Sequence, residues 1–186
     1  MWIETYTGKR FYPLDPDPSS VDIEDIAHAL SNLCRFTGHC REFYSVATHS
    51  ILCAREAWRY YYGFGPGLPS RMGLLALLHD AAEAYCSDVA YPIKPHLTGY
   101  AEIEERIMQA IYKGLGITPP DDIEEDRIRH IDHRMGATEA SQLMPFKDWE
   151  QWQDLEPYDI DVSKDLDMPT KDYFLYMYYA LREDSK

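Results

Sequence analysis

The segment Leu-Leu-Ala-Leu-Leu-His-Asp-Ala-Ala-Glu, residues 74–83, places three ionisable side chains at the end of a strongly apolar run. Residues three or four positions apart lie on the same side of a helix, so we expect Glu83 to lie on the same side as His79 and Asp80. Burying such groups is costly unless they are paired or bind a metal. The His79-Asp80 pair alone leaves two interpretations open. It is part of a metal ligand set, or His79 is a core histidine with a satisfied hydrogen bond.

Further nitrogen and oxygen ligands lie in two other segments that are predicted to be helical. His49 follows Ser-Val-Ala-Thr, and Asp132 follows Arg-His-Ile. Two imidazoles and two carboxylates suit Mn²⁺, Fe²⁺, Co²⁺, Zn²⁺ or Mg²⁺, and a set without thiolate argues against a structural zinc site. The four cysteines have no metal-binding spacing and are interpreted as packing residues. His130 and His133 flank Asp132 but point to other faces of the helix, so we expect them in solvent or in outer contacts.

The order His49, His79-Asp80, Asp132 resembles the H…HD…D signature of the HD-domain phosphohydrolases. The local sequence is similar to the bacterial 5′-deoxynucleotidase branch and its phage and biosynthetic relatives, some of which cleave deoxynucleoside triphosphates. The similarity covers roughly residues 20 to 145 and rests on four blocks, which are Cys34–His39, Ser45–Ser50, Leu77–Glu83 and Ser87–Lys94. It implies an all-α HD-domain helical bundle in which His49, His79, Asp80 and Asp132 bind a divalent metal ion.

The resemblance also implies two catalytic carboxyl groups. Glu83 would orient or deprotonate a water molecule. Asp88 would face the leaving group or the sugar, and its structural alternative is to cap a helix. Because binding alone would not need a water-activating carboxylate, Glu83 together with the four ligands favours an enzyme over a nucleotide-binding module.

Four further residues of these blocks are predicted to bind substrate. Arg35 and Lys94 would balance phosphate charge, since phosphoryl transfer depends on positioning and electrostatics. Their alternative is a solvated surface charge. His39 would contact phosphate or a second ion, or else pack within its loop, and Phe36 would stack on a base or belong to the core.

We therefore expect a divalent-metal-dependent phosphohydrolase that acts on (deoxy)nucleotides and releases phosphate from deoxynucleoside 5′-phosphates. The alternatives within the same superfamily are a dNTP triphosphohydrolase (such as one acting on dATP) that releases tripolyphosphate, a cyclic-nucleotide phosphodiesterase and a biosynthetic nucleotide phosphatase. A non-catalytic nucleotide-binding module is the alternative from another class. The apolar residues that would meet the base are not identified by the pattern.

Composition agrees with one helical domain. A chain of 186 residues with 45% hydrophobic content can bury a sizeable core. The net charge of −14 argues against a long nucleic acid as partner. We find no apolar run near the ~20 residues that a membrane helix needs and no signal-peptide pattern, so we expect a cytoplasmic protein without membrane contact. Relatives commonly form dimers, and we expect a homodimer or a higher homo-oligomer.

The predicted elements divide the chain into three parts. Residues 1–19 form a short β-hairpin, with a turn at Gly8-Lys9, and a linker. Residues 20–145 form the metal-binding helical core, and residues 146–186 form an acidic loop and a C-terminal helix capped by Thr170, whose aromatic stripe suits core or an oligomer contact. The core helices are predicted near Asp22–Leu33, Ser45–Tyr62, Ser70–Tyr85, Tyr100–Leu115 and Asp122–Leu143. Ser70 is the expected cap of its helix, and Gly114 and Gly116 are expected to end theirs.

Overall fold

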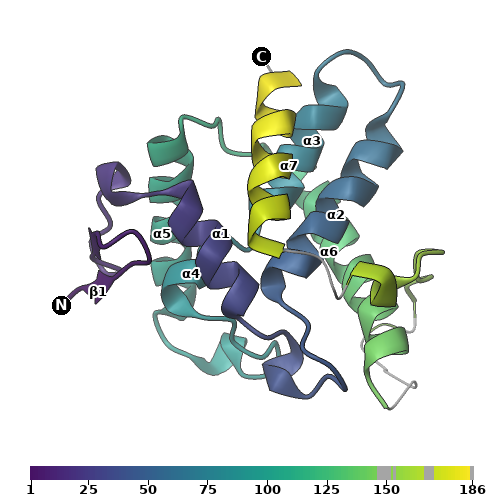
Figure 1. Ribbon diagram of the computed structural model, residues 1–186, viewed down its shortest axis with the longest axis horizontal. Helices are drawn as coiled ribbons and strands as arrows, with labels where there is room; N and C mark the ends of the chain where they lie inside the picture. Colours follow the sequence, from purple (N-terminus) through teal and green to yellow (C-terminus); the bar gives the residue numbers. More distant parts are fainter. Residues whose placement is uncertain (146–151, 153, 166–169, 185–186) are drawn as a thin grey trace.

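The computed structural model describes residues 1–145, 152, 154–165 and 170–184 (Figure 1). The described chain is mostly helical, with one small two-stranded antiparallel sheet, as the all-α prediction expects. The sheet consists of β1 (Ile3–Glu4) and β2 (Arg10–Phe11). The α-helices are α1 (Ile23–Asn32), α2 (Val46–Tyr61), α3 (Leu68–Leu78), α4 (Glu83–Cys86), α5 (Tyr100–Leu115), α6 (Asp122–Leu143) and α7 (Thr170–Asp184). Short 3-10 helices occur at Pro18–Ser20, Phe36–Gly38, Lys94–His96 and Val162–Asp165.

Helix α3 lies at the centre of the bundle. Its residues 74–78 are all buried, and a helix that is apolar on every side must be surrounded by other elements. Helices α2, α6 and α7 pack against α3, and α7 also packs against α1 and α2 (Figure 1). The C-terminal aromatic stripe belongs to this core, since Phe174, Tyr178 and Leu181 are buried. The stripe is therefore part of the core, whereas Tyr176 and Tyr179 of the same helix are exposed.

The N-terminal hairpin is confirmed, and several contacts anchor it to the helices. Ile3 pairs with Phe11, and Gly8 takes a positive φ of 81° in the turn between the strands. The buried ring of Phe11 stacks on Tyr85, with ring centroids 3.7 Å apart. The backbone N–H of Thr7 donates to the carboxylate of Asp25 at 2.7 Å, so this buried carboxylate has a partner.

The prediction of one helix from Ser70 to Tyr85 is wrong, because helix α3 stops at Leu78. The imidazole of His79 bonds the carbonyl of Ala76 through Nδ1 at 2.7 Å, and it competes there with the backbone N–H groups that would continue the helix. Tighter bonds between residues three apart replace the helical pattern, including Ala81 N–H to Leu78 O at 2.9 Å. The cap prediction is also wrong, because the helix starts at Leu68 and Ser70 is buried inside it.

Two glycines of the α5 region have different roles from those predicted. Gly116 ends α5 in the left-handed conformation, with φ of 64°. Gly114 lies within the helix instead of ending it, and a Cβ there would lie 2.3 Å from the carbonyl oxygen of Pro18. Gly114 therefore permits the close approach of the Pro18–Ser20 turn to α5.

The predicted acidic loop falls partly outside the described residues, which exclude 146–151, 153 and 166–169. Its described part contains the short helix Val162–Asp165 and the side chain of Trp152. Thr170 is the first residue of α7, and the position before it lies outside the described residues. Within the described chain, no helix is both long and apolar enough to cross a membrane.

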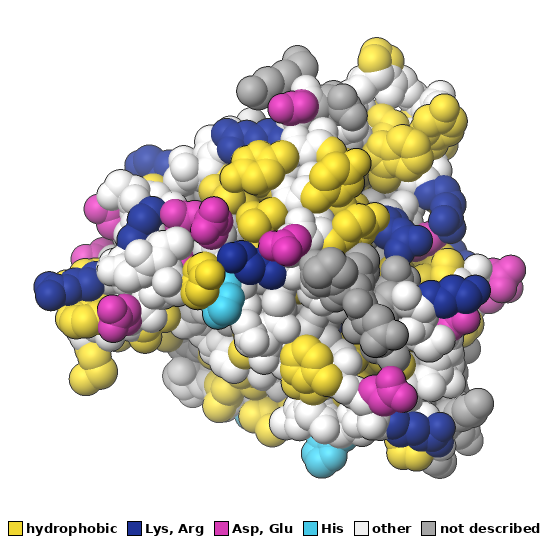
Figure 2. All heavy atoms as spheres, viewed as in Figure 1, with side chains coloured by type: hydrophobic (Ala, Val, Ile, Leu, Met, Phe, Trp, Pro, Cys, Tyr) yellow, Lys and Arg dark blue, Asp and Glu magenta, His cyan; other side chains and the backbone are white. Residues whose placement is uncertain are grey.

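Aromatic side chains gather over the end of α2 and the loop that joins it to α3, toward the upper right of Figure 2. The exposed members are Trp58, Tyr60, Tyr62 and Phe64. Tyr60 and Phe64 stack at a centroid distance of 6.0 Å. Charged groups of both signs are scattered over the rest of this face (Figure 2).

Candidate metal centre and its cavity

The four predicted ligands converge from three separate segments of the chain. His49 comes from α2, His79 and Asp80 from the turn after α3, and Asp132 from α6. The Nε2 atoms of the two histidines are 3.3 Å apart. Asp80 Oδ2 lies 3.2 Å from His79 Nε2 and 3.8 Å from His49 Nε2. Asp132 Oδ1 lies 3.0 Å from His49 Nε2 and 3.7 Å from His79 Nε2.

These separations suit donors that share one ion. Two nitrogens that each lie about 2.0 to 2.1 Å from a tetrahedral ion are about 3.3 to 3.4 Å apart, which matches the two histidines. Two neutral imidazoles and two carboxylates are the donor set expected of a borderline or hard divalent ion. The side chains that meet here therefore fit a divalent metal.

Outer contacts aim both imidazoles at the same point. A carbonyl oxygen can only accept, so His79 Nδ1 must carry the proton that bonds Ala76 O. The Nδ1 of His49 lies 2.6 Å from Oε1 of the fully buried Glu139 and donates to it. In each ring Nε2 is therefore the nitrogen that can bind a metal once it has lost its own proton, which is the arrangement that ligating histidines use.

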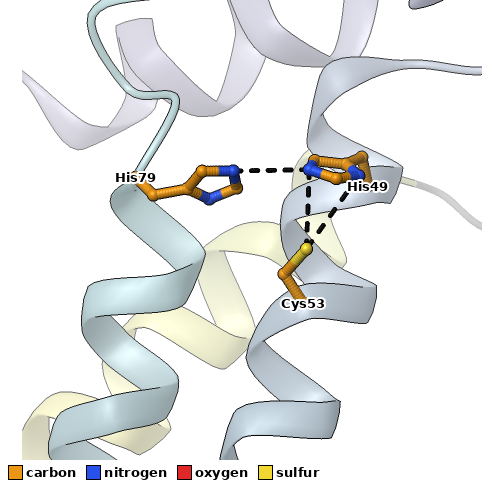
Figure 3. Close-up of side chains that lie close together, drawn as sticks. All are labelled: His49, Cys53 and His79. Carbon is orange, nitrogen blue, oxygen red and sulfur yellow. Dashed lines mark hydrogen bonds between the residues drawn. The ribbon is translucent and has the colours of Figure 1, made fainter. Parts of the chain in front are cut away.

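Cys53 supplies a second donor set with the same histidines. It lies one turn after His49 on α2, and its Sγ is 3.5 Å from His49 Nε2 (Figure 3). One donor atom from each of His49, Cys53 and His79 lies within 4.8 Å of the others, so this group could hold a metal ion. The prediction that the cysteines only fill the core is incomplete for Cys53, although all four are free thiols.

The carboxylates dominate the electrostatics of the cluster. Burial alone would lower the pKa of His79, but Asp80 and Asp132 outweigh it and raise that pKa well above its usual value. Burial would likewise raise the pKa of Asp80, yet the neighbouring His79 lowers it to about 2. The pKa of Asp132 falls well below its usual value because its bonds to His49 and His79 outweigh its burial. Both carboxylates are thus held as anions, which is the form that binds a metal.

A cavity of about 380 Å³ opens beside the cluster. It is lined by Asp80 and Asp132 and by every residue predicted to act in catalysis or substrate binding, namely Glu83, Asp88, Arg35, Phe36, His39 and Lys94. The structure therefore brings the predicted catalytic and substrate-binding residues together around one space with two of the four predicted ligands, Asp80 and Asp132. His130 and His133 are exposed, as predicted, and neither lines this cavity.

Glu83 begins α4 and is buried in the wall of this cavity. Its Oε2 has no hydrogen-bond partner among the described residues, and a buried polar atom without a partner calls for a water, an ion or a substrate. Burial, with Asp80 and Asp88 adding to it, raises the pKa of Glu83 well above its usual value. Burial is also the main reason that the pKa of Asp88 is raised. Asp88 caps no helix in the described chain.

The two cations that line the cavity are already paired. Arg35 Nη1 lies 3.4 Å from Asp80 Oδ2, and its Nε lies 3.2 Å from Glu139 Oε2 without the alignment of a hydrogen bond. Lys94 Nζ donates to Glu104 at 2.7 Å. Neither cation is the freely solvated surface charge that was the alternative. His39 is exposed at the rim, and the ring of Phe36 meets Trp152 edge to face with centroids 6.3 Å apart.

The backbone is strained at the border of the cavity. In the described chain, the non-glycine residues with positive φ are Phe36, Thr37 and Ser87, at 52°, 54° and 71°. The first two line the cavity, and the third precedes Asp88. Such conformations are costly and concentrate at functional sites, where the surrounding structure holds them.

Glu139, Tyr44 and Cys53 are the residues of the centre that the sequence did not reveal. Glu139 follows Asp132 by seven residues, which is two helical turns and places both on one side of α6. That spacing is the signal that could have identified it. Tyr44, whose hydroxyl donates to Glu139 Oε1 at 2.7 Å, carries no comparable pattern.

Two bacterial proteins are similar to this chain over most of its length. YfdR of Escherichia coli strain K12 is 37% identical over 142 residues, which are 76% of this chain and 72% of YfdR. The chain belongs to the YfdR family. A second relative, RCAP_rcc00048 of Rhodobacter capsulatus, is 34% identical over 154 residues, which are 80% of this chain and 76% of the relative. Both relatives are named as uncharacterized proteins, and no family model matches the chain.

Proposed function

We propose that this YfdR family member is a divalent-metal-dependent phosphohydrolase of the HD-domain type, which releases phosphate from deoxynucleoside 5′-phosphates. One observation carries the proposal. The donor atoms of His49, His79, Asp80 and Asp132 meet beside a cavity whose wall contains the unpartnered carboxylate of Glu83. A metal site and a buried base on one cavity are what hydrolysis by an activated water requires.

The metal ligands and Glu83 would act on the attacking water. When bound, a divalent ion lowers the pKa of a coordinated water and polarises a phosphoryl oxygen. Glu83 would take a proton from the attacking water as the oxygen of that water bonds to phosphorus. Because burial raises the pKa of Glu83, its carboxylate is a stronger base than an ordinary glutamate. Glu139 keeps the ring of His49 oriented throughout.

The rest of the cavity would hold the substrate and the leaving group. The bond from phosphorus to the 5′ oxygen breaks, and that oxygen needs a proton. Asp88, whose pKa burial raises, is the carboxyl group suited to donate it. Arg35 and Lys94 oppose the phosphate charge, and the ring of Phe36 offers a face to the base.

The test is a product analysis with purified protein that is stripped of metal and reloaded separately with Co²⁺, Mn²⁺, Zn²⁺, Fe²⁺ or Mg²⁺. Deoxynucleoside mono-, di- and triphosphates are incubated with it, and the products are separated by ion exchange. We expect nucleoside and orthophosphate from the monophosphates, with at least one of the ions. The Asp80→Ala variant should lose this activity, whereas Asp172→Ala, at an exposed position on α7, should keep it.

Three other outcomes would contradict the proposal. Nucleoside and tripolyphosphate from the triphosphates would identify a triphosphohydrolase. Tight nucleotide binding without turnover with any of the ions would identify a binding module. Activity that survives Asp80→Ala would place the reaction outside this metal centre.

A further inference from the structure

A second cavity, of about 440 Å³, shares no lining residue with the cavity beside the metal centre. It lies between the C-terminal part of α2, helix α6 and Tyr158. Arg127, His130 and Arg134 line it from α6, where their spacing of three and four residues puts them on one side of the helix. Asp132 lies five positions after Arg127 and therefore points elsewhere on α6.

The charge balance of this cavity is unusual for a protein of net charge −14. Two carboxylates line it, and each already has a cation. Glu56 accepts from Arg59 at 2.8 Å, and Asp126 accepts from Arg129 at 3.3 Å. Among the described residues, neither Arg127 nor Arg134 pairs with a carboxylate, so the cavity has uncompensated positive charge.

Neighbouring groups hold both of these guanidinium groups in place, and each guanidinium keeps N–H donors that are free to bind a ligand. Arg127 Nη1 donates to the hydroxyl of Tyr61 at 2.8 Å. Arg134 lies 4.0 Å above the ring centre of Tyr158, and its Nε donates to the carbonyl of Glu156 at 2.6 Å. A guanidinium has five N–H donors, so most of these groups stay available for an anion. Because the arginines are already oriented, binding would cost them little side-chain entropy.

Aromatic rings complete the walls. Tyr60, Tyr61 and Tyr158 line the cavity, and Tyr60 as a residue is 62% exposed. An exposed aromatic ring beside two arginines that have no carboxylate partner among the described residues suits a ligand in which a planar group is joined to a phosphate. The volume lies in the range of about 300 to 1,000 Å³ that small-molecule sites occupy.

We propose that this second cavity binds a nucleotide, with its phosphate on Arg127 and Arg134 and its base on Tyr60. His130 adds a donor near the phosphate. The assignment does not rest on hydrolysis at the metal centre, because the two cavities have separate linings.

Equilibrium dialysis of the metal-loaded protein with a radiolabelled deoxyadenosine 5′-phosphonate, whose P–C bond resists hydrolysis, tests the site. The test variant is Arg127→Glu, and the matched control is Arg106→Glu, which reverses the charge of another exposed arginine, on α5. We expect two binding sites in the unmodified protein and in the control. In Arg127→Glu the affinity of one site should fall at least about tenfold.

The stoichiometry separates this proposal from the function proposed for the metal centre. If the metal centre binds no nucleotide, the unmodified protein binds one phosphonate and Arg127→Glu binds none with comparable affinity. If Arg127→Glu binds the phosphonate as the control does, the second site is disproved. The same conclusion follows if the Asp80→Ala variant loses the Arg127-dependent site.

Tyr60 distinguishes a nucleotide from a bare anion. Tyr60→Ala should weaken the phosphonate at this site at least about fivefold, whereas Tyr60→Phe, which keeps the ring, should not. Inorganic phosphate should bind far more weakly than the phosphonate and should not respond to Tyr60→Ala. Equal affinity for both probes, unaffected by Tyr60→Ala, would show an inorganic anion site and overturn the nucleotide assignment.

Discussion

Glu139 joins three side chains that are far from it in the sequence. Its Oε1 accepts from the hydroxyl of Tyr44 and from Nδ1 of His49, and its Oε2 lies 3.2 Å from Arg35. Burial would raise its pKa, but His49 and Arg35 outweigh the burial and lower it, so Glu139 is an anion. A fully buried carboxylate held in this way fixes the orientation and the tautomer of the histidine that it contacts.

Glu139→Gln should weaken divalent metal binding about 10- to 100-fold, because the amide keeps the shape but loses the charge that orients His49. Titration calorimetry with Co²⁺ measures the change. The matched control is Glu56→Gln, at another buried glutamate, which pairs with Arg59 outside the metal centre. Equal Co²⁺ affinities of the two variants would show that Glu139 does not position the ligand.

Glu83→Gln should lower kcat about 10²- to 10⁴-fold while the metal stays bound, since it removes the proposed proton acceptor. The raised pKa of Glu83 also predicts a pH dependence. A base must be ionised, so activity should fall as the pH drops through this raised pKa, at a higher pH than for an ordinary glutamate. Rates measured from pH 4 to 8 check this. A variant with unchanged kcat would assign the base to another group.

The helix boundaries show what local sequence can and cannot predict. Asp22, Ser45 and Asp121 cap α1, α2 and α6 through their own side chains, and the predicted starts agree to within a residue or two. The pattern does not predict the end of α3 at Leu78, where the ring of His79 competes for the carbonyl of Ala76. Helical periodicity continues through that segment, so the pattern contains no signal for the interruption.

Gly114→Ala should lower the free energy of unfolding by about 1 to 3 kcal/mol, because a Cβ would clash with backbone 2.3 Å away. Urea unfolding followed by circular dichroism measures the loss. Gly136→Ala on α6 is the matched control, since its nearest neighbour, Trp152, would be 3.5 Å from the new methyl group. The control should be neutral or stabilising by up to about 1 kcal/mol. Similar values for both would show that α5 and the Pro18–Ser20 turn can separate freely.

The packing of the bundle decides how its amphipathic faces are used. The stripe of α7 suits either core or an oligomer contact, and only its position across α1 and α3 makes it core. A helical pattern identifies an apolar face but not the partner that covers it. Oligomerisation stays a prediction, and the aromatic cluster of Trp58, Tyr60, Tyr62 and Phe64 is an exposed apolar surface that the described chain leaves uncovered.

Phe174→Ala should destabilise the protein by about 3 to 5 kcal/mol, because this fully buried ring joins α7 to the core. Tyr176→Ala removes a ring of similar size from the same helix, but one that is 66% exposed, and it should change stability by no more than about 0.5 kcal/mol. Chemical unfolding of both variants makes the comparison. Comparable losses would contradict the orientation of α7.

The sequence predicts the four metal ligands better than it predicts the residues around them. His49, His79, Asp80 and Asp132 are recognisable by residue type and order, and the fold brings their donor atoms together. Glu139 is near His49 through the packing of α6 on α2, whereas Cys53 lies one turn after His49 on α2 itself. The sequence therefore leaves two donor sets, one with the carboxylates and one with the thiol.

The absorption spectrum of the Co²⁺-loaded protein tests the proposed ligands most directly. With nitrogen and oxygen donors only, one Co²⁺ should bind per chain without a sulfur-to-cobalt charge-transfer band, Asp132→Ala should weaken binding, and Cys53→Ser should leave the spectrum unchanged. A charge-transfer band that Cys53→Ser abolishes, with binding that survives Asp132→Ala, would contradict the four-ligand centre and the hydrolytic site built on it.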